Sequence, residues 1–320
     1  MDIFYFIFQL ALASLIPLAV VAFGALFAER SGVINIAMEG IMLMGGFVGA
    51  AMMLTLEGLD LPAQWIVLIA MLTGAGVGLL YSLLHAFASI NMKSDQIISA
   101  TALNLFAPAF AIFMARTYGA EGTRQINLGQ SYKIAEVPIL SDIPILGPMF
   151  FEQAFISTYI GAAIFIVSYI VLYKTRFGLR LRACGENPSA ADSVGINIYR
   201  MRYAGVMISG ALAGLGGVIF VISFANNFNS TVNGFGFLAI AVLIFGQWKP
   251  SRILLAASFF GLMRVISSAY DAIPVLNTLG IPREIYSIIP YVATLLVLAF
   301  VSKKSVAPRA AGQPYDAGKR

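Results

Sequence analysis

Long apolar runs alternate with short polar connections along most of the chain. The runs lie at about 3–27, 33–56, 63–90, 96–116, 154–174, 203–224, 236–248, 251–270 and 285–301. Most of them reach the roughly 20 residues that a helix needs to cross the core of a bilayer. The pattern therefore predicts an all-α protein, a polytopic bundle of transmembrane helices.

The run at 236–248 is too short to cross a membrane. It follows a glycine-rich start, and we predict a half-helix or a re-entrant element packed among other helices. Its sequence, "NGFGFLAIAVLIFG", loosely echoes "NIAMEGIMLMGGF" in the first half of the chain, since both begin with asparagine and glycines bracket both. Such an echo is typical of duplicated transporters with interrupted helices. We predict eight to ten spans, including interrupted or half-helices.

Composition strengthens this prediction. Of the 320 residues, 59% are hydrophobic and 11% are charged, and the mean hydropathy is +0.86. Soluble domains average roughly 45–50% apolar and about 25% charged residues. The net charge of +5 would suggest nucleic acid in a soluble protein. In a membrane protein the excess of basic residues reflects membrane topology. We therefore predict that the chain lies in a lipid bilayer and does not bind nucleic acid. The first ten residues lack the basic region and cleavage site of a secretory signal, so the first run is expected to be a retained span.

The basic residues also predict orientation. Six of them lie in the connection at 174–202, and more follow in the tail at 303–320, whereas the connection at 117–153 holds four acidic and two basic residues. By the positive-inside rule, the loop at 175–202 and the C-terminal tail face the cytoplasm, and 117–153 faces outward. We divide the chain into a transmembrane domain at 1–302 and a basic cytoplasmic tail at 303–320.

Two glycine-rich runs, "GAGVG" at 74–78 and "GALAGLGG" at 210–217, favour close packing of helices. Gly74 and Gly78 are four residues apart, as are Gly210 and Gly214. Each pair can clear one helix face for a neighbouring backbone. A dinucleotide-binding interpretation fails, because no strand-turn-helix unit surrounds either run.

The sequence offers little catalytic chemistry. It has no GxxxxGK[ST] phosphate loop, no HExxH and no GxSxG. Cys184 and His85 are single residues of their kinds, so neither an internal disulfide nor a cofactor or metal cluster is predicted. Uphill transport would draw on an ion gradient or on a separate ATPase. Intramembrane ionisable residues are few: we interpret His85 as a satisfied interfacial residue and Arg264 as a side chain that snorkels to the outer interface.

Glu39 is the exception, a carboxylate inside an apolar run. If 33–56 is helical, Asn35 and Glu39 lie on one stripe. A carboxylate facing lipid would cost about 2.5–3.5 kcal/mol, so this stripe should face protein or water. Two interpretations of Glu39 remain. In the preferred one, its carboxylate accepts hydrogen bonds from backbone amides where a helix breaks, near Gly40 or Gly45-Gly46. In the other, it lines a substrate path. Asn35, Glu39 and Asn104 are the polar residues that we place nearest such a path.

The loop "TRFGLRLRACGENPSAADSVGIN", residues 175–197, is too polar to enter lipid. Asn187 and Pro188 signal a turn, the following serine can cap a short helix, and Gly195 can stop it. The predicted object is a short helix with a face of small residues on basic stems. Such a helix can fit a cleft on another protein, or it can be an ordinary capped loop.

"GLRLRACGENPSAADSVGIN" resembles the cytoplasmic loop of permease subunits in ABC importers of the branched-chain amino acid/ribose type. "ERSGVINIAMEGIMLMGGF" and "GFGFLAIAVLIFGQWKP" resemble the nucleoside-uptake branch of that family. The three motifs follow one another in the expected order, and the resemblance covers about 15–302. It leaves the hydrophilic tail outside.

The resemblance implies the permease subunit of an ATP-driven importer for nucleosides, multi-pass in a bacterial inner membrane. ATP would be hydrolysed by a partner ATPase subunit, a paralogous second permease would pair with this chain, and an extracytoplasmic binding protein would deliver substrate. The loop would be the coupling helix that docks on the ATPase, through Gly185, Glu186, Asn187, Pro188, Ala190, Ala191, Gly195 and Ile196.

Three alternatives compete with this function. The permease could carry simple sugars such as ribose, or the chain could be an ion-coupled secondary transporter. An intramembrane enzyme would need a catalytic pair at membrane depth, and the sequence offers none.

Overall fold

The computed structural model describes residues 2–118, 124–224, 227–268, 307–316 and seven positions between 282 and 295. Its helices are α1 Asp2–Arg30, α2 Met38–Glu57, α3 Ala63–Ala86, α4 Gln96–Tyr118, α5 Ile156–Lys174, α6 Arg176–Glu186, α7 Pro188–Ser193, α8 Ile198–Phe224, α9 Phe235–Phe245 and α10 Pro250–Ser268. Two π-helical turns, η1 Phe87–Asn91 and η2 Gly147–Phe151, accompany them. The short strands β1 Ile126–Asn127 and β4 Asn227–Phe228 form one antiparallel pair, and β2 Ile134–Glu136 and β3 Glu152–Ala154 form another.

Among the described residues, seven helices are long and apolar enough to cross a membrane, namely α1 to α5, α8 and α10. This confirms the prediction of an all-α polytopic bundle. The short run at 236–248 is α9, an apolar helix of 11 residues. It rises only about 16 Å, roughly half of a bilayer core. The last predicted run, 285–301, lies mostly outside the described residues.

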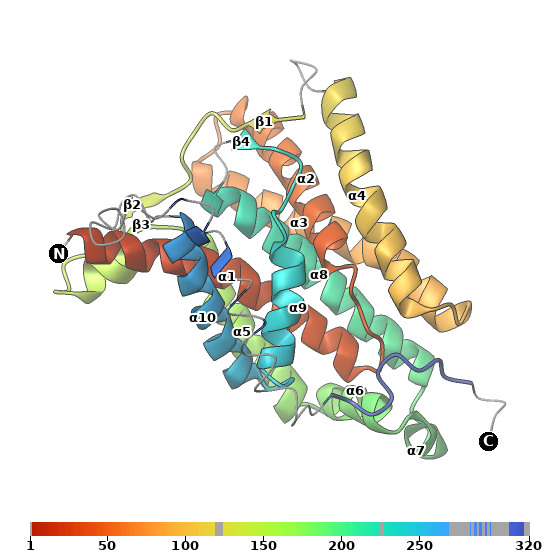
Figure 1. The fold of residues 1–320 in the computed structure, drawn as a ribbon. Helices are drawn as coiled ribbons and strands as arrows, with labels where there is room; N and C mark the ends of the chain where they lie inside the picture. Colours follow the sequence, from red (N-terminus) through yellow and green to blue (C-terminus); the bar gives the residue numbers. More distant parts are fainter. Residues whose placement is uncertain are drawn as a thin grey trace.

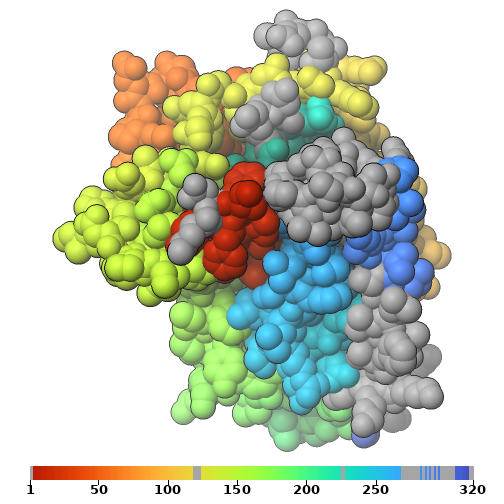
Figure 2. Space-filling view, turned by 60° about the vertical axis from the view of Figure 1, so that its left-hand side comes forward, coloured from red at the N-terminus to blue at the C-terminus, as the bar shows by residue number. Residues whose placement is uncertain are grey.

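The bundle has two distinct ends (Figure 1). The short strands and the connections between them lie at one end, which we call the strand end. Helices α6 and α7 and the tail segment 307–316 lie at the other, which we call the α7 end. Figure 2 shows the start of α1 at the surface, with α10 beside it.

Helix α8 lies at the centre of the bundle, and α1, α2 and α3 pack around it. The two predicted glycine pairs face each other across the contact of α3 with α8. A methyl group added at Gly78 would lie 2.8 Å from the Cα of Gly214, and one at Gly74 would lie 3.2 Å from the carbonyl oxygen of Gly214. These glycines let the backbones of two helices touch, as the sequence predicted.

The run at 33–56 differs from its prediction. It is not helical throughout, because residues 33–36 are irregular and α2 begins only at Met38. Gly32, with a φ of +95°, turns the chain out of α1. Helix α2 then continues without a break past Gly40 and Gly45, where a break was expected. The interruption therefore precedes the glycines instead of coinciding with them.

The same arrangement recurs in the second half of the chain. Irregular residues 229–234 lead from β4 into α9, as 31–37 lead from α1 into α2. The two helices run in opposite directions, since α2 ends at the strand end and α9 ends towards the α7 end (Figure 1). The loose sequence echo thus corresponds to two interrupted elements of opposite sense, as in transporters with inverted repeats.

Candidate transport site

The start of α9 is held by a carboxylate from α2. Glu39 Oε1 accepts a hydrogen bond of 2.8 Å from the amide of Gly234, and Oε2 accepts bonds of 2.7 and 3.3 Å from the amides of Gly236 and Phe237. The first amides of a helix lack partners within the helix and carry its positive dipole end. Glu39 therefore caps a helix that begins almost 200 residues later in the chain.

The backbone before α9 is shaped for this cap. Asn233 and Gly234 both have positive φ, 52° and 78°. Gly234 is followed directly by the right-handed helical Phe235, and in such a turn successive backbone amides can point into one concavity, an anion-binding nest. Gly234 itself supplies no side chain to cap α9. The anion in this nest is the Glu39 carboxylate.

The two helix starts are also in direct contact. Gly236 lies against the backbone of Glu39, so closely that an added methyl group would collide with the Glu39 nitrogen and Cα. The same methyl group would lie 2.8 Å from Glu39 Oε2. Only glycine allows this approach, so the first turns of α2 and α9 meet as one junction.

Asn35 and Asn104 hold the irregular segment before α2. Asn104 accepts a 2.8 Å bond from the amide of Gly40 and donates a 2.9 Å bond to the carbonyl of Ile36. Asn35 accepts from the amide of Ala37 at 3.1 Å and donates to the hydroxyl of Ser209 on α8, also at 3.1 Å. Both carboxamides thus bind backbone that has left the helix.

His85 and Gln96 complete this anchoring. The Nε2 atom of His85 lies 3.0 Å from the carbonyl oxygen of Ile34, and its Nδ1 lies 2.9 Å from the hydroxyl of Ser99. Gln96 accepts a 2.8 Å bond from the amide of Ile34. Both ring nitrogens of the fully buried His85 therefore have a partner, which agrees with the prediction of a satisfied histidine.

The structure places Arg264 at this junction as well. Its guanidinium lies 5.1 Å from the ring centroid of Phe235, the first residue of α9. The sequence predicted a side chain that reaches for the outer interface, whereas the cation stacks on a ring at the start of a half-helix. No local pattern indicated this pairing, because the two residues lie on different helices.

A second junction lies where α9 ends. Trp248 Nε1 donates a 2.5 Å bond to Glu29, and the carbonyl of Trp248 accepts a 2.8 Å bond from Arg30. Gln247 and Trp248 both have positive φ, 49° and 55°, which is unusual for side chains of this size. The last turn of α1 therefore holds the turn after α9 in a strained conformation. The sequence analysis missed this contact.

The predicted coupling loop forms two helices, α6 and α7. Asn187 caps α7 by accepting a 3.1 Å bond from the amide of Ala190, and Gly195 ends the turn with a φ of +82°. The capping residue is thus Asn187 and not the serine that follows Pro188. Glu186, Asn187, Ala190 and Gly195 are exposed, and Pro188 and Ile196 are half-buried.

Two of the loop's small residues face this chain itself. Ala191 is 3% exposed and packs with Cys184 and Ile198. Gly185 is buried against the backbone at the end of α1. The expectation that these two residues meet a partner is therefore not what the structure shows. The exposed apolar residues of the loop are Leu179 and Val194, at 63% and 75% exposure.

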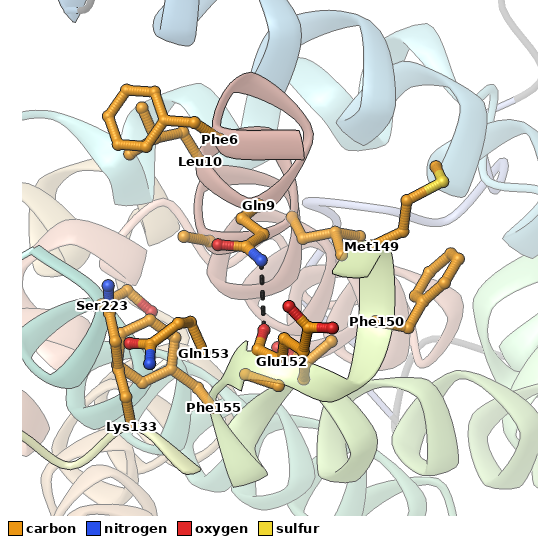
Figure 3. Close-up of a pocket in the computed structure, with 14 residues that line it drawn as sticks. Phe6, Gln9, Leu10, Lys133, Met149, Phe150, Glu152, Gln153, Phe155 and Ser223 are labelled. Atoms are coloured by element: carbon orange, nitrogen blue, oxygen red, sulfur yellow. Dashed lines mark hydrogen bonds between the residues drawn. The ribbon is translucent and has the colours of Figure 1, made fainter. Parts of the chain in front are cut away.

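A separate small pocket of about 70 Å³ opens at the strand end, between the start of α1, η2, β3 and α5. Figure 3 shows Gln9 directed towards Glu152 across this pocket. The Gln9 amide donates to the carbonyls of Pro148 and Glu152, at 2.9 and 3.1 Å. These bonds tie the strand end to α1. The pocket has no lining residue from α2 or α9, so it is distinct from the junction of these two helices.

Helices long and apolar enough to cross a membrane, with two interrupted elements that meet inside the bundle, are typical of membrane transport proteins. Comparison with known proteins identifies the kind of transporter. The chain belongs to the family described as branched-chain amino acid transport system/permease component, whose model matches residues 7–298.

The most similar relatives considered are permeases of ABC transporters. The nucleoside ABC transporter permease protein NupC of Lactococcus lactis is 40% identical over 93% of both chains. The guanosine ABC transporter permease protein NupQ of Bacillus subtilis is 40% identical over 95% of this chain and 94% of its own. The putative glucose ABC transporter permease protein TsgC13 of Haloferax volcanii is 30% identical over 92% of each. This chain is a multi-pass permease of the ABC type.

Proposed function

We propose that this permease carries nucleosides through a bacterial inner membrane as one subunit of an ATP-driven importer. The observation that supports this substrate class is the likeness to NupC and NupQ, at 40% identity over nearly the full length of each chain. A glucose permease shares 30% identity over a similar length. Simple sugars therefore remain the second candidate.

The substrate path is proposed to pass the junction of α2 and α9. Glu39 and Arg264 are only half-buried there, and Asn233 and Phe237 are exposed on the surface of this chain. Since α9 rises about 16 Å from its end, its start lies near the middle of the bilayer. Polar groups that face lipid at this depth are costly, so the surface at the junction should face water or another subunit.

The three residues expected near the path have a more specific role in this proposal. Asn35, Glu39 and Asn104 use their polar groups for hydrogen bonds to backbone at the two helix starts and, in the case of Asn35, also to Ser209. They therefore shape the path instead of binding solute. The Phe237 ring, 50% exposed beside the Glu39 cap, is the better candidate for contact with a nucleobase. An aromatic face suits a flat base, whereas a sugar would need hydroxyl partners.

Helices α6 and α7 are proposed to be the site where an ATPase subunit docks. Leu179 and Val194 expose apolar surface on a loop that is too polar to enter lipid. A partner subunit that covers both side chains would remove this apolar surface from water, which favours a contact here. The docking surface would comprise Leu179, Ala190 and Val194, and the buried Gly185 and Ala191 would support it from within.

This assignment fixes the orientation that we propose. The α7 end, with the loop at 175–202 and the tail, faces the cytoplasm, and the strand end with 117–153 faces outward, in agreement with the positive-inside rule. ATP would be hydrolysed by the docked subunit. A paralogous second permease and an extracytoplasmic binding protein complete the proposed importer.

Uptake measurements test the substrate. The chain is expressed with its genomic partner subunits in cells that lack their own nucleoside uptake, and labelled adenosine, uridine, guanosine, ribose and glucose are supplied. We expect uptake of the nucleosides, lost on ATP depletion and retained when the proton or sodium gradient is collapsed. Uptake of a sugar without any nucleoside would replace the substrate class. Uptake that survives ATP depletion but not gradient collapse would indicate a secondary transporter.

A further inference from the structure

The tail segment 307–316 folds back onto the α7 end of the bundle. It lies beyond the family match, which ends at residue 298. The amide of Ala310 donates a 2.9 Å bond to the carbonyl of Gly185, and the amide of Gly312 donates a 3.2 Å bond to the carbonyl of Gly32. Pro308 and Ala310 are buried in this contact. Ten residues of the tail therefore contact both the last turn of α6 and the turn after α1.

A buried cation strengthens the contact. Arg202 on α8 is 1% exposed, and its Nη1 donates a 2.9 Å bond to the carbonyl of Gln313. Within the described part of the chain, its Nε and Nη2 have no hydrogen-bond partner. A buried guanidinium is costly unless its donors are satisfied. The tail carbonyl supplies an acceptor, so departure of the tail would leave this cation less satisfied still.

Side chains at the rim of the tail add less. Asp316 pairs with Lys93 at 3.1 Å, and Arg309 pairs with Glu186 at 3.5 Å. Both pairs are exposed, and exposed pairs contribute little to stability. Tyr315 meets the ring of Tyr199 edge-on, with centroids 6.0 Å apart. The backbone bonds and Arg202 therefore dominate the docking of the tail.

We propose that residues 307–316 form a strap that couples the loop of α6 and α7 to the junction of α2 and α9. The strap binds Gly185 just before α7 and, two residues further on, Gly32 just before the irregular segment that leads to Glu39. A displacement of the loop would be carried along this short path to the cap of α9. This role rests on the proposed docking of an ATPase at the loop.

The chain carries its own reporter of strap release. Cys184, its single cysteine, is fully buried in the cluster with Ala191 and Ile198, and Tyr315 of the strap packs against that cluster. Burial raises the pKa of the Cys184 thiol to about 11. A maleimide should thus react slowly while the strap is docked and faster once Tyr315 has left.

Two variants release the strap. In Gly312→Val the new residue must hold a φ of +79°, and its Cβ would lie 2.9 Å from the Cδ1 of Ile34. A truncation after residue 306 removes the strap altogether. Gln313→Ala is the matched control, because it changes an exposed side chain of the strap and keeps the carbonyl that Arg202 binds.

Maleimide labelling of Cys184 is measured in membranes of the whole transporter, and nucleoside uptake and ATP hydrolysis are measured at matched levels of inserted protein. We expect both release variants to label about tenfold faster than the wild type, as loss of a backbone bond plus strain would allow. Uptake per ATP should fall several-fold in both, and Gln313→Ala should match the wild type. If the truncated chain fails to insert into the membrane, the comparison is made with Gly312→Val alone.

Unchanged labelling of Cys184 in the release variants would overturn the docking of the strap. Faster labelling with unchanged uptake per ATP would overturn its coupling role. A wild type that imports sugars in place of nucleosides would remove the proposed substrate class, and the comparison of uptake per ATP would then use the sugar. The strap and the substrate class are therefore tested separately.

Discussion

Removing the Glu39 carboxylate should separate the two helix starts. In Glu39→Leu, the amides of Gly234, Gly236 and Phe237 lose their acceptor. A buried donor left without a partner costs about 1–3 kcal/mol. The amides of Gly234 and Gly236 would together cost roughly 2–6 kcal/mol on this scale. The longer bond of 3.3 Å at the exposed Phe237 adds little. Glu39→Gln keeps one oxygen acceptor and should cost about half as much.

The assay is a reversible denaturation of the purified protein in mixed micelles, combined with uptake at matched membrane levels. We expect the order wild type, Glu39→Gln, Glu39→Leu in both stability and uptake. Glu136→Leu is the control, because that carboxylate is exposed on β2 at the strand end. If Glu39→Leu were as stable as Glu136→Leu, the carboxylate would not hold α9, and the structural role derived for it would be refuted.

Three further predictions follow from the packing. Gly236→Ala should lower stability by about 1–3 kcal/mol, because the methyl group meets the backbone at the start of α2, whereas Gly76→Ala, with open space around it, should be neutral in the same denaturation assay. Val194→Asp should reduce co-purification of the ATPase while the permease stays at its normal level in the membrane. Ala191→Trp should instead lower the amount of inserted permease. The reverse pattern would contradict the arrangement in which Val194 faces outward and Ala191 faces this chain. Because burial raises the pKa of the Cys184 thiol to about 11, maleimide labelling should keep rising with pH from 8 to about 10, and a plateau near pH 9 would argue against a buried thiol.

The apolar runs predicted the fold well because a membrane span is a local property of about 20 residues. The shortness of the run at 236–248 likewise revealed a half-helix. The sequence misplaces the interruption before α2, because a glycine needed for close helix packing looks the same in the sequence as a glycine at a helix break. In the structure Gly45 provides close contact with α8 and Gly40 with α4, while the turn at Gly32 and the irregular residues after it interrupt the chain.

The candidate site could be predicted only in part. The sequence identified Glu39 as a carboxylate that needs donors, because an unpaired charge in lipid is costly. Its donors lie 195 to 198 residues away in the chain, and no local pattern records such a pairing. The same limit explains why Arg264 and Trp248 were not connected to the site. Ala191 was read as an outward residue because a pattern of small residues does not tell which side of a six-residue helix is buried.

The cap on α9 also has a consequence for charge selection. The exposed start of a half-helix is a natural binding site for anionic solutes, because free amides and the helix dipole both attract negative charge. Here the Glu39 carboxylate of the protein itself already occupies that position. A phosphorylated solute that reached the junction would meet a carboxylate in place of free amides, and would gain none of the attraction that an uncapped helix start offers. An uncharged solute would lose nothing by this, so a path past the junction would favour neutral solutes.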